Sequence, residues 1–145
     1  MKLDFIHVGI TVKDLDVTRR FYEKLGFTAA EPFATSWEEY WQAKNSFYQL
    51  PEGTNGEILF MQSAGGAKLE FFWFDKLEEC QSTVWNRIGI HHLALTTDDL
   101  DAVVKSLTDD GIEFEIGPVA GKTQTFLFFK DPDGNLIEIG EPYKK

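Results

Sequence analysis

Two kinds of hydrophobic pattern follow one another along the chain. Apolar residues at alternate positions predict strands near 5–12, 27–34, 57–63, 67–74, 90–96, 112–116, 123–130 and 135–140. Apolar residues four apart predict amphipathic helices after the first and fifth of these strands, on Val17, Phe21 and Leu25 and on Val103 and Leu107. A strand, a helix and three further strands therefore occur twice, which predicts an α+β fold.

The two halves also repeat in sequence. Shifting the chain by 85 positions places FIHVGITVKDLDVTRRFYEKLGF (5–27) over IHHLALTTDDLDAVVKSLTDDGI (90–112). Six positions then coincide, where chance gives roughly one or two: His7 with His92, Thr11 with Thr96, Asp14 with Asp99, Leu15 with Leu100, Asp16 with Asp101, and Gly26 with Gly111. The aspartates suit helix N-caps and the glycines helix C-termini. We expect one domain over 1–145, with βαβββ modules at about 3–74 and 90–141 and a linker at about 75–89.

The segment SWEEYWQAKN at 36–45 has no counterpart in the second half. Ser36 and Glu39 form a capping-box pattern, which predicts a short helix inserted into module one at about 36–46. Its aromatic residues Trp37, Tyr40 and Trp41 suit either a lid over a cavity or a packed surface helix.

Adjacent histidines open the second repeat. Successive side chains of a strand point to opposite faces, so His91 and His92 are not expected to line one site. Only His92 has a partner in the first repeat, which is His7. The other residues on the strand faces of these two histidines have small side chains, as faces that open onto a cavity require. They are Gly9, Thr11, Ala94 and Thr96. We therefore expect His92 to be functional and His91 to be structural.

Two glutamates occupy a second pair of equivalent positions. GAKLE (66–70) and GNLIE (134–138) each place a glutamate four residues after a glycine, among apolar neighbours. A lone strand histidine is usually structural and a lone strand glutamate usually solvated, but burying an unpaired carboxylate costs several kcal/mol. The repeat therefore predicts a cation, with His7, Glu70, His92 and Glu138 as its ligands. Phe72 and Phe74 share the face of Glu70 and are expected to line a pocket or to be core.

Composition and charge exclude several classes of partner and site. A formal charge of −10 and a pI near 4.7 disfavour nucleic acid and anionic membranes as partners. The single cysteine, Cys80, excludes an internal disulfide and a cysteine-based zinc site. No apolar run approaches the roughly 18 residues of a membrane span. These features predict a cytoplasmic globular protein.

The chain resembles the vicinal oxygen chelate superfamily, which includes glyoxalase I, methylmalonyl-CoA epimerase, extradiol dioxygenases and bleomycin resistance proteins. The resemblance covers about 5–140 and is clearest in HVGITVKDLDVTRRFYEKLGF and DPDGNLIEIGEP. It implies two βαβββ modules in a pseudo-twofold repeat that curve into a cupped mixed sheet. It also implies that the first and last strands of each module hold a divalent ion (Ni, Zn, Co, Mn or Fe) through His7, Glu70, His92 and Glu138.

The same resemblance implies an activity. Glyoxalase-type members suggest a lyase or isomerase that moves a proton alpha to a metal-polarised carbonyl, through an enediolate-like intermediate, with Glu138 as the base and Glu70 as the second catalytic carboxylate. A small-molecule substrate and a homodimer are expected. The alternatives are a non-catalytic, drug-sequestering binding protein and a metal-dependent dioxygenase. Glu70 disfavours the dioxygenase, because oxygen-activating members use two histidines and one carboxylate. The chain has only three arginines and lacks the arginine-containing segments associated with glutathione binding in glyoxalase I, so the resemblance does not identify the substrate.

Overall fold

The computed structural model describes residues 1–30, 48–79, 85–86 and 88–144. They fall into two compact units, Met1–Cys80 and Gln81–Lys145, and each unit is described by itself. The inserted helix expected at 36–46, with its aromatic residues, and Cys80 lie outside the described residues, as does part of the expected linker.

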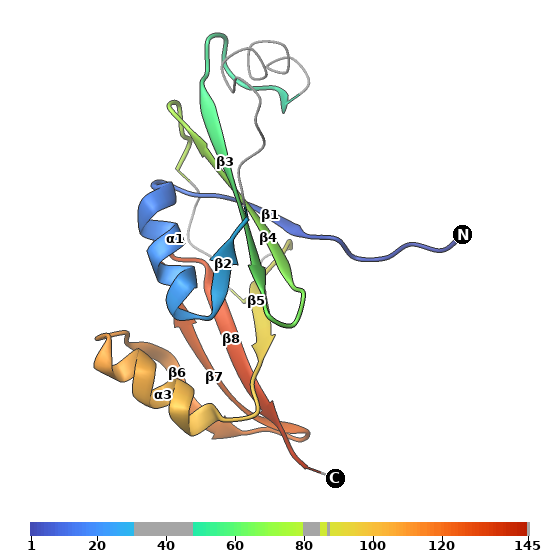
Figure 1. Cartoon of the computed structure of the whole chain (residues 1–145), viewed down its shortest axis with the longest axis vertical. Helices are drawn as coiled ribbons and strands as arrows, with labels where there is room; N and C mark the ends of the chain where they lie inside the picture. Colours follow the sequence, from blue (N-terminus) through green and yellow to red (C-terminus); the bar gives the residue numbers. More distant parts are fainter. Residues whose placement is uncertain (31–47, 80–84, 87, 145) are drawn as a thin grey trace. The chain divides into compact units, whose positions relative to one another are not determined.

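Within the described residues, each unit has one helix and four strands in the same order along the chain (Figure 1). The first unit has β1 (Val8–Thr11), α1 (Leu15–Lys24), β2 (Phe27–Ala29), β3 (Gly56–Ser63) and β4 (Lys68–Phe74). The second has β5 (His92–Thr96), α3 (Leu100–Asp109), β6 (Phe114–Ala120), β7 (Gln124–Lys130) and β8 (Leu136–Pro142). Two βαβββ modules and the α+β class are thereby confirmed.

The two sheets have equivalent topologies. Their strand orders are β1-β4-β3-β2 and β5-β8-β7-β6. The first and last strands of each module pair in parallel, and the other neighbours pair antiparallel, so both sheets are mixed. Each module thus brings its first strand beside its last one, although these strands lie far apart in sequence. A cup formed by the two modules together stays a prediction.

Helices α1 and α3 begin and end at the predicted residues. The carboxylate of Asp14 accepts the N–H of Val17 at 2.9 Å, and that of Asp99 accepts the N–H of Ala102 at 2.9 Å. Such caps satisfy N–H groups that lack partners in the first helical turn. Gly26 and Gly111 follow the helices with φ values of 83° and 74°, a left-handed conformation that favours glycine.

The buried face of α1 differs from the predicted stripe by one position. Thr18 and Tyr22 are almost fully buried, whereas Val17 is 37% exposed. The ring of Tyr22 packs against Phe27 at 5.8 Å and Phe71 at 4.7 Å between centroids. A tyrosine and a threonine can face the sheet because their apolar atoms pack against it. The predicted stripe counted only aliphatic residues and phenylalanine, so it missed both. Phe21 and Leu25 remain half-buried at the edge of this face.

The second module is held by a core between α3 and its sheet and by the turn after β7. Leu107, Leu127, Phe129 and Ile137 are almost fully buried. In the turn, the buried carboxylate of Asp131 accepts the N–H groups of Asp133 and Asn135 at 3.0 and 2.8 Å. These bonds close the β7–β8 hairpin in one register. No helix in the described ranges is long and apolar enough to cross a membrane.

Candidate functional site

The first predicted pair, His7 and Glu70, meets at one end of the first sheet. Parallel pairing of β1 with β4 places Glu70 opposite Gly9, two residues after His7. Side chains two apart lie on the same strand face. His7 lies one residue before β1, and it still meets this face: its Nε2 lies 2.9 Å from Oε2 of Glu70. The carboxylate is largely buried, with 14% of its side chain exposed, and the imidazole beside it provides a polar partner.

The second pair repeats this geometry. Parallel pairing of β5 with β8 places Glu138 opposite Ala94, two residues after His92. Nε2 of His92 lies 3.0 Å from Oε2 of Glu138, whose side chain is 16% exposed. The register, the atoms in contact, their separation and the burial of the carboxylate all match the first pair. The repeat detected in the sequence therefore extends to the contacts of its polar side chains.

The residues that neighbour the histidines on β1 and β5 are arranged as predicted. Gly9, Thr11, Ala94 and Thr96 are exposed, while the alternate positions are half-buried or buried. A Cβ on Gly9 would lie 3.3 Å from the ring of Phe72, so the small residue leaves room for this aromatic. Phe72 stacks on Phe74 at 6.2 Å between centroids, on the face of Glu70.

His91 does not face away from His92, contrary to the prediction from strand alternation. The Nδ1 atoms of the two histidines lie 2.9 Å apart. The reason is that β5 begins at His92, so His91 precedes the strand and is not bound by its alternation. The ring of Trp85 lies 3.8 Å from that of His91 between centroids and covers it.

Two further residues contact the second pair and were not identified from the sequence. Nε2 of Gln124 donates to Oε1 of Glu138 at 2.8 Å, and the ring of Phe128 lies 5.3 Å from that of His92. Phe128 was detectable in principle, because alternation in TQTFLFFK places it on one strand face with Gln124. The residues of β8 that Gln124 and Phe128 contact depend on the register of the β7–β8 hairpin, which the sequence pattern does not give.

A hollow of about 290 Å³ in the second module is lined by two aromatic neighbours of His92, although neither His92 nor Glu138 lines it. Its lining includes Trp85 and Phe128, both of which contact the ring of His92, together with the half-buried Ile116. Glu115 and Lys130 also line it and form an ion pair at 2.9 Å. A mainly aromatic and aliphatic wall with a few polar groups is typical of small-molecule sites.

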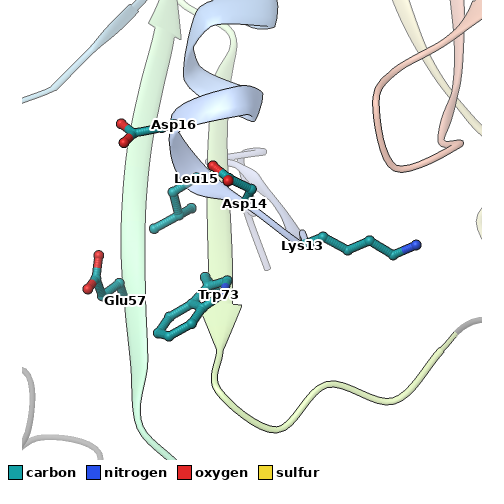
Figure 2. Close-up of a pocket in the computed structure, with 6 residues that line it drawn as sticks. All are labelled: Lys13, Asp14, Leu15, Asp16, Glu57 and Trp73. Carbon is teal, nitrogen blue, oxygen red and sulfur yellow. The ribbon is translucent and has the colours of Figure 1, made fainter.

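A second hollow, of about 310 Å³, lies in the first module away from the predicted ligands (Figure 2). Its walls are the start of α1, with Asp14, Leu15 and Asp16, and the strand residues Glu57 and Trp73. Trp73 alternates with Glu70 along β4 and shares the face of buried Leu69 and Phe71. This hollow is therefore on the helix-covered face, opposite the His7–Glu70 pair.

The donor atoms of each pair suit a first-row divalent ion. Nitrogen and oxygen ligands about 2.1 Å from an ion and at right angles are about 3.0 Å apart, which matches the observed separations of 2.9 and 3.0 Å. Imidazole and carboxylate are ligands that Zn, Ni, Co, Mn and Fe accept. Across the described residues, no group of three or more His, Cys, Asp or Glu side chains is gathered as a metal site. Each module brings together two of the four predicted ligands.

Comparison with known proteins agrees with this architecture. Residues 4–139 match the family model of the Glyoxalase/Bleomycin resistance protein/Dioxygenase superfamily. The chain is 32% identical to the uncharacterized protein YwkD of Bacillus subtilis (strain 168), over 93% of this chain and 94% of that one. It is 27% identical to a lactoylglutathione lyase of Haemophilus influenzae, over 96% and 93% of the two chains.

The fold also matches a solved structure along its length. A glyoxalase family protein from Bacillus cereus superposes with a TM-score of 0.81 at 21% identity, covering 99% of this chain and 97% of that one. At this identity the likeness establishes the fold alone. Together with the family model, it leads to one conclusion: the chain belongs to the Glyoxalase/Bleomycin resistance protein/Dioxygenase superfamily.

Proposed function

We propose that the protein is a divalent-metal-dependent lyase or isomerase of the glyoxalase type. In this proposal His7, Glu70, His92 and Glu138 hold one ion, and a substrate carbonyl binds beside them. The observation that carries the proposal is the equality of the two His–Glu pairs, which have the same register and separations of 2.9 and 3.0 Å. A His–Glu pair at the equivalent place in both modules is the arrangement that two halves of one coordination shell require.

Each residue type has a defined task in this proposal. When bound, the ion supplies a Lewis acid that polarises the substrate carbonyl and stabilises the negative charge that develops beside it. The two imidazoles bind through Nε2, and the two carboxylates balance the charge of a dication. Glu138 accepts the proton from the carbon next to the carbonyl and returns it, as a general base and then a general acid. Glu70 is the second carboxylate available for this transfer.

The relatives support the reaction class more than the substrate. Several relatives at 26–28% identity carry the name lactoylglutathione lyase. The substrate in that name belongs to those proteins and is not carried over to this chain. The hollow lined by Trp85, Phe128 and the Glu115–Lys130 ion pair supports a small molecule with an apolar part. Candidate substrates are therefore thiol adducts of α-ketoaldehydes, hydroxyacyl thioesters and, for the dioxygenase alternative, catechols.

Metal loading tests the proposal first. Purified protein, stripped with chelator and dialysed against Ni, Co, Zn, Mn or Fe, is expected to retain about one equivalent of at least one ion per set of four ligands. Elemental analysis measures this retention, and the loaded protein is then assayed on the three substrate classes. Proton transfer on a thiol adduct or a thioester supports the proposal. A protein that retains no ion but binds apolar ligands would instead be the drug-sequestering alternative, and oxygen uptake with a catechol would indicate the dioxygenase.

We also propose that the protein is a homodimer. The short segments before β1 and β5 expose apolar side chains at repeat-equivalent positions, with Leu3 matching Ile88 and Phe5 matching Ile90, and all four are at least 82% exposed. Exposed apolar residues at matched positions favour burial against another protein surface. In each sheet the first strand is an edge strand, which also needs a cover. A second copy of the chain supplies both in a symmetric way.

Light scattering checks this association. The unmodified protein is expected at twice its monomer mass of 16.6 kDa. Phe5→Asp combined with Ile90→Asp is expected to shift the mass toward the monomer, because two charges would be buried at the interface. Val119→Asp, at an exposed apolar position of β6, is the matched control and is expected to leave the dimer intact. A mass of 16.6 kDa at all concentrations of the unmodified protein would reject the dimer.

A further inference from the structure

The two glutamates differ in one contact, although their histidine pairs match. In the second module both carboxylate oxygens of Glu138 have a partner: Oε2 lies 3.0 Å from Nε2 of His92, and Oε1 accepts from Nε2 of Gln124 at 2.8 Å. The amide therefore holds the carboxylate by the oxygen that does not contact the imidazole. A carboxylate with both oxygens engaged has less freedom to rotate than one held at a single oxygen.

Glycine at position 140 makes this contact possible. Antiparallel pairing places Glu138 opposite Phe128, Gly140 opposite Phe126 and Pro142 opposite Gln124. Gly140 therefore lies on β8 between Glu138 and the residue that faces Gln124. A Cβ on Gly140 would lie 2.6 Å from Oε1 and 2.8 Å from Nε2 of Gln124. A side chain at position 140 would therefore displace the amide of Gln124 from this place. The amide of Gln124 therefore crosses the backbone of Gly140 to reach Glu138.

The first module places its glycine and its large residue the other way round. Glu70 lies opposite Phe60, as Glu138 lies opposite Phe128, so Gly56 takes the position of Gln124 and Phe72 that of Gly140. A Cβ on Gly56 would lie 2.6 Å from the ring of Phe74, which fills this space. Gly56 has no side chain, so no amide reaches Glu70 from this position. The repeat is thus broken at the amide, while the ligand positions are kept.

We propose that Gln124 is a positioning residue for Glu138, a role that rests on the metal centre proposed above. By holding Oε1, the amide directs Oε2 toward Nε2 of His92 and the shared ligand position. The two glutamates then have different tasks: Glu138 is oriented by the protein, and Glu70 depends on His7 alone among these partners. A neutral amide does this without adding a charge to the site.

Two different substitutions remove the contact and so test the role. Gln124→Ala deletes the amide, and Gly140→Ala displaces it by steric contact while leaving the glutamine in place. Both variants are expected to lose about 10–100-fold in affinity for Ni or Zn, measured by competition with a chromophoric chelator, because partners of ligating carboxylates have effects of this size. The double variant is expected to show no more than the larger single loss, since both changes remove one contact. Gln62→Ala, at an exposed position of β3, is the matched control and is expected to keep the affinity.

A purely structural role gives a different result. Gln124→Ala and Gly140→Ala would then lower the unfolding temperature but leave the metal affinity of the folded protein unchanged, and this outcome would overturn the proposal. A metal-free measurement separates this proposal from the metal centre itself. In the stripped protein, Glu138→Ala is expected to shift the side-chain amide resonances of Gln124 in ¹⁵N–¹H spectra, and unchanged resonances would overturn the positioning role. If the unmodified protein takes up no ion, the proposed function fails, and the amide resonances still decide whether Gln124 holds Glu138.

Discussion

Replacing His92 with alanine is expected to abolish the retention of a divalent ion after dialysis. The substitution removes one of the two imidazoles from the proposed shell. Glu138 then loses its contact with His92 and keeps its hydrogen bond from Gln124. The loss is expected to exceed the about 10–100-fold typical of a residue that acts through a ligand. Elemental analysis of dialysed protein measures the retained ion, and thermal unfolding confirms that the variant is folded.

His7→Ala and His91→Ala are the comparisons that make this result specific. Because His7 has the same register and the same contact with its glutamate, its replacement is expected to cause an equal loss. His91 contacts His92 through Nδ1, so His91→Ala is expected to weaken binding only about 10–100-fold. Full retention of the ion by His92→Ala, or a larger loss from His91→Ala than from His92→Ala, contradicts the assignment of ligands.

Replacing Glu138 with glutamine is expected to lower the rate of proton transfer about 10²–10⁴-fold, the usual contribution of a general base. Glutamine keeps the shape of the side chain and an oxygen for binding, but it does not accept a proton. The rate is measured as incorporation of solvent deuterium at the reacting carbon of a substrate found among the three classes above. Rates are compared per metal-loaded protein, so that a loss of ion is not counted as a loss of catalysis.

Glu70→Gln is the comparison for this experiment, because Glu70 is the second carboxylate available for the transfer. The two carboxylates are equally buried and equally placed beside a histidine, so a nonspecific effect of neutralising one of them appears in both variants. If Glu70→Gln reduces the rate while Glu138→Gln does not, then Glu70 is the base and the assignment is wrong.

Much of the fold was predictable because it depends on local rules. The caps at Asp14 and Asp99 and the glycines after both helices were identified from residue type and position, and the structure confirms them. Hydrophobic alternation located β3, β4, β7 and β8 to within a few residues. The buried face of α1 was misplaced by one position, because the packing of Tyr22 on Phe71 is a tertiary contact.

The candidate site was predictable in part for a similar reason. The repeat made His7 equivalent to His92 and Glu70 equivalent to Glu138, and the structure brings the members of each pair to within 3.0 Å. The convergence of both pairs on one ion stays a prediction. Gln124 was missed because its contact with Glu138 requires the register of the β7–β8 hairpin and the missing side chain of Gly140.

The sequence by itself determined the α+β order and the two modules, because periodicity and internal repetition are properties of a linear string. The choice of His92 over His91 as a ligand stays a prediction. Tertiary structure decided the rest. Parallel pairing of the first and last strands set Glu70 opposite Gly9 and Glu138 opposite Ala94. The start of β5 at His92 brought His91 against its neighbour, and Gly140 let an amide reach Glu138. These contacts join residues distant in sequence or lie at the end of a strand, where local periodicity carries no information about which atoms meet.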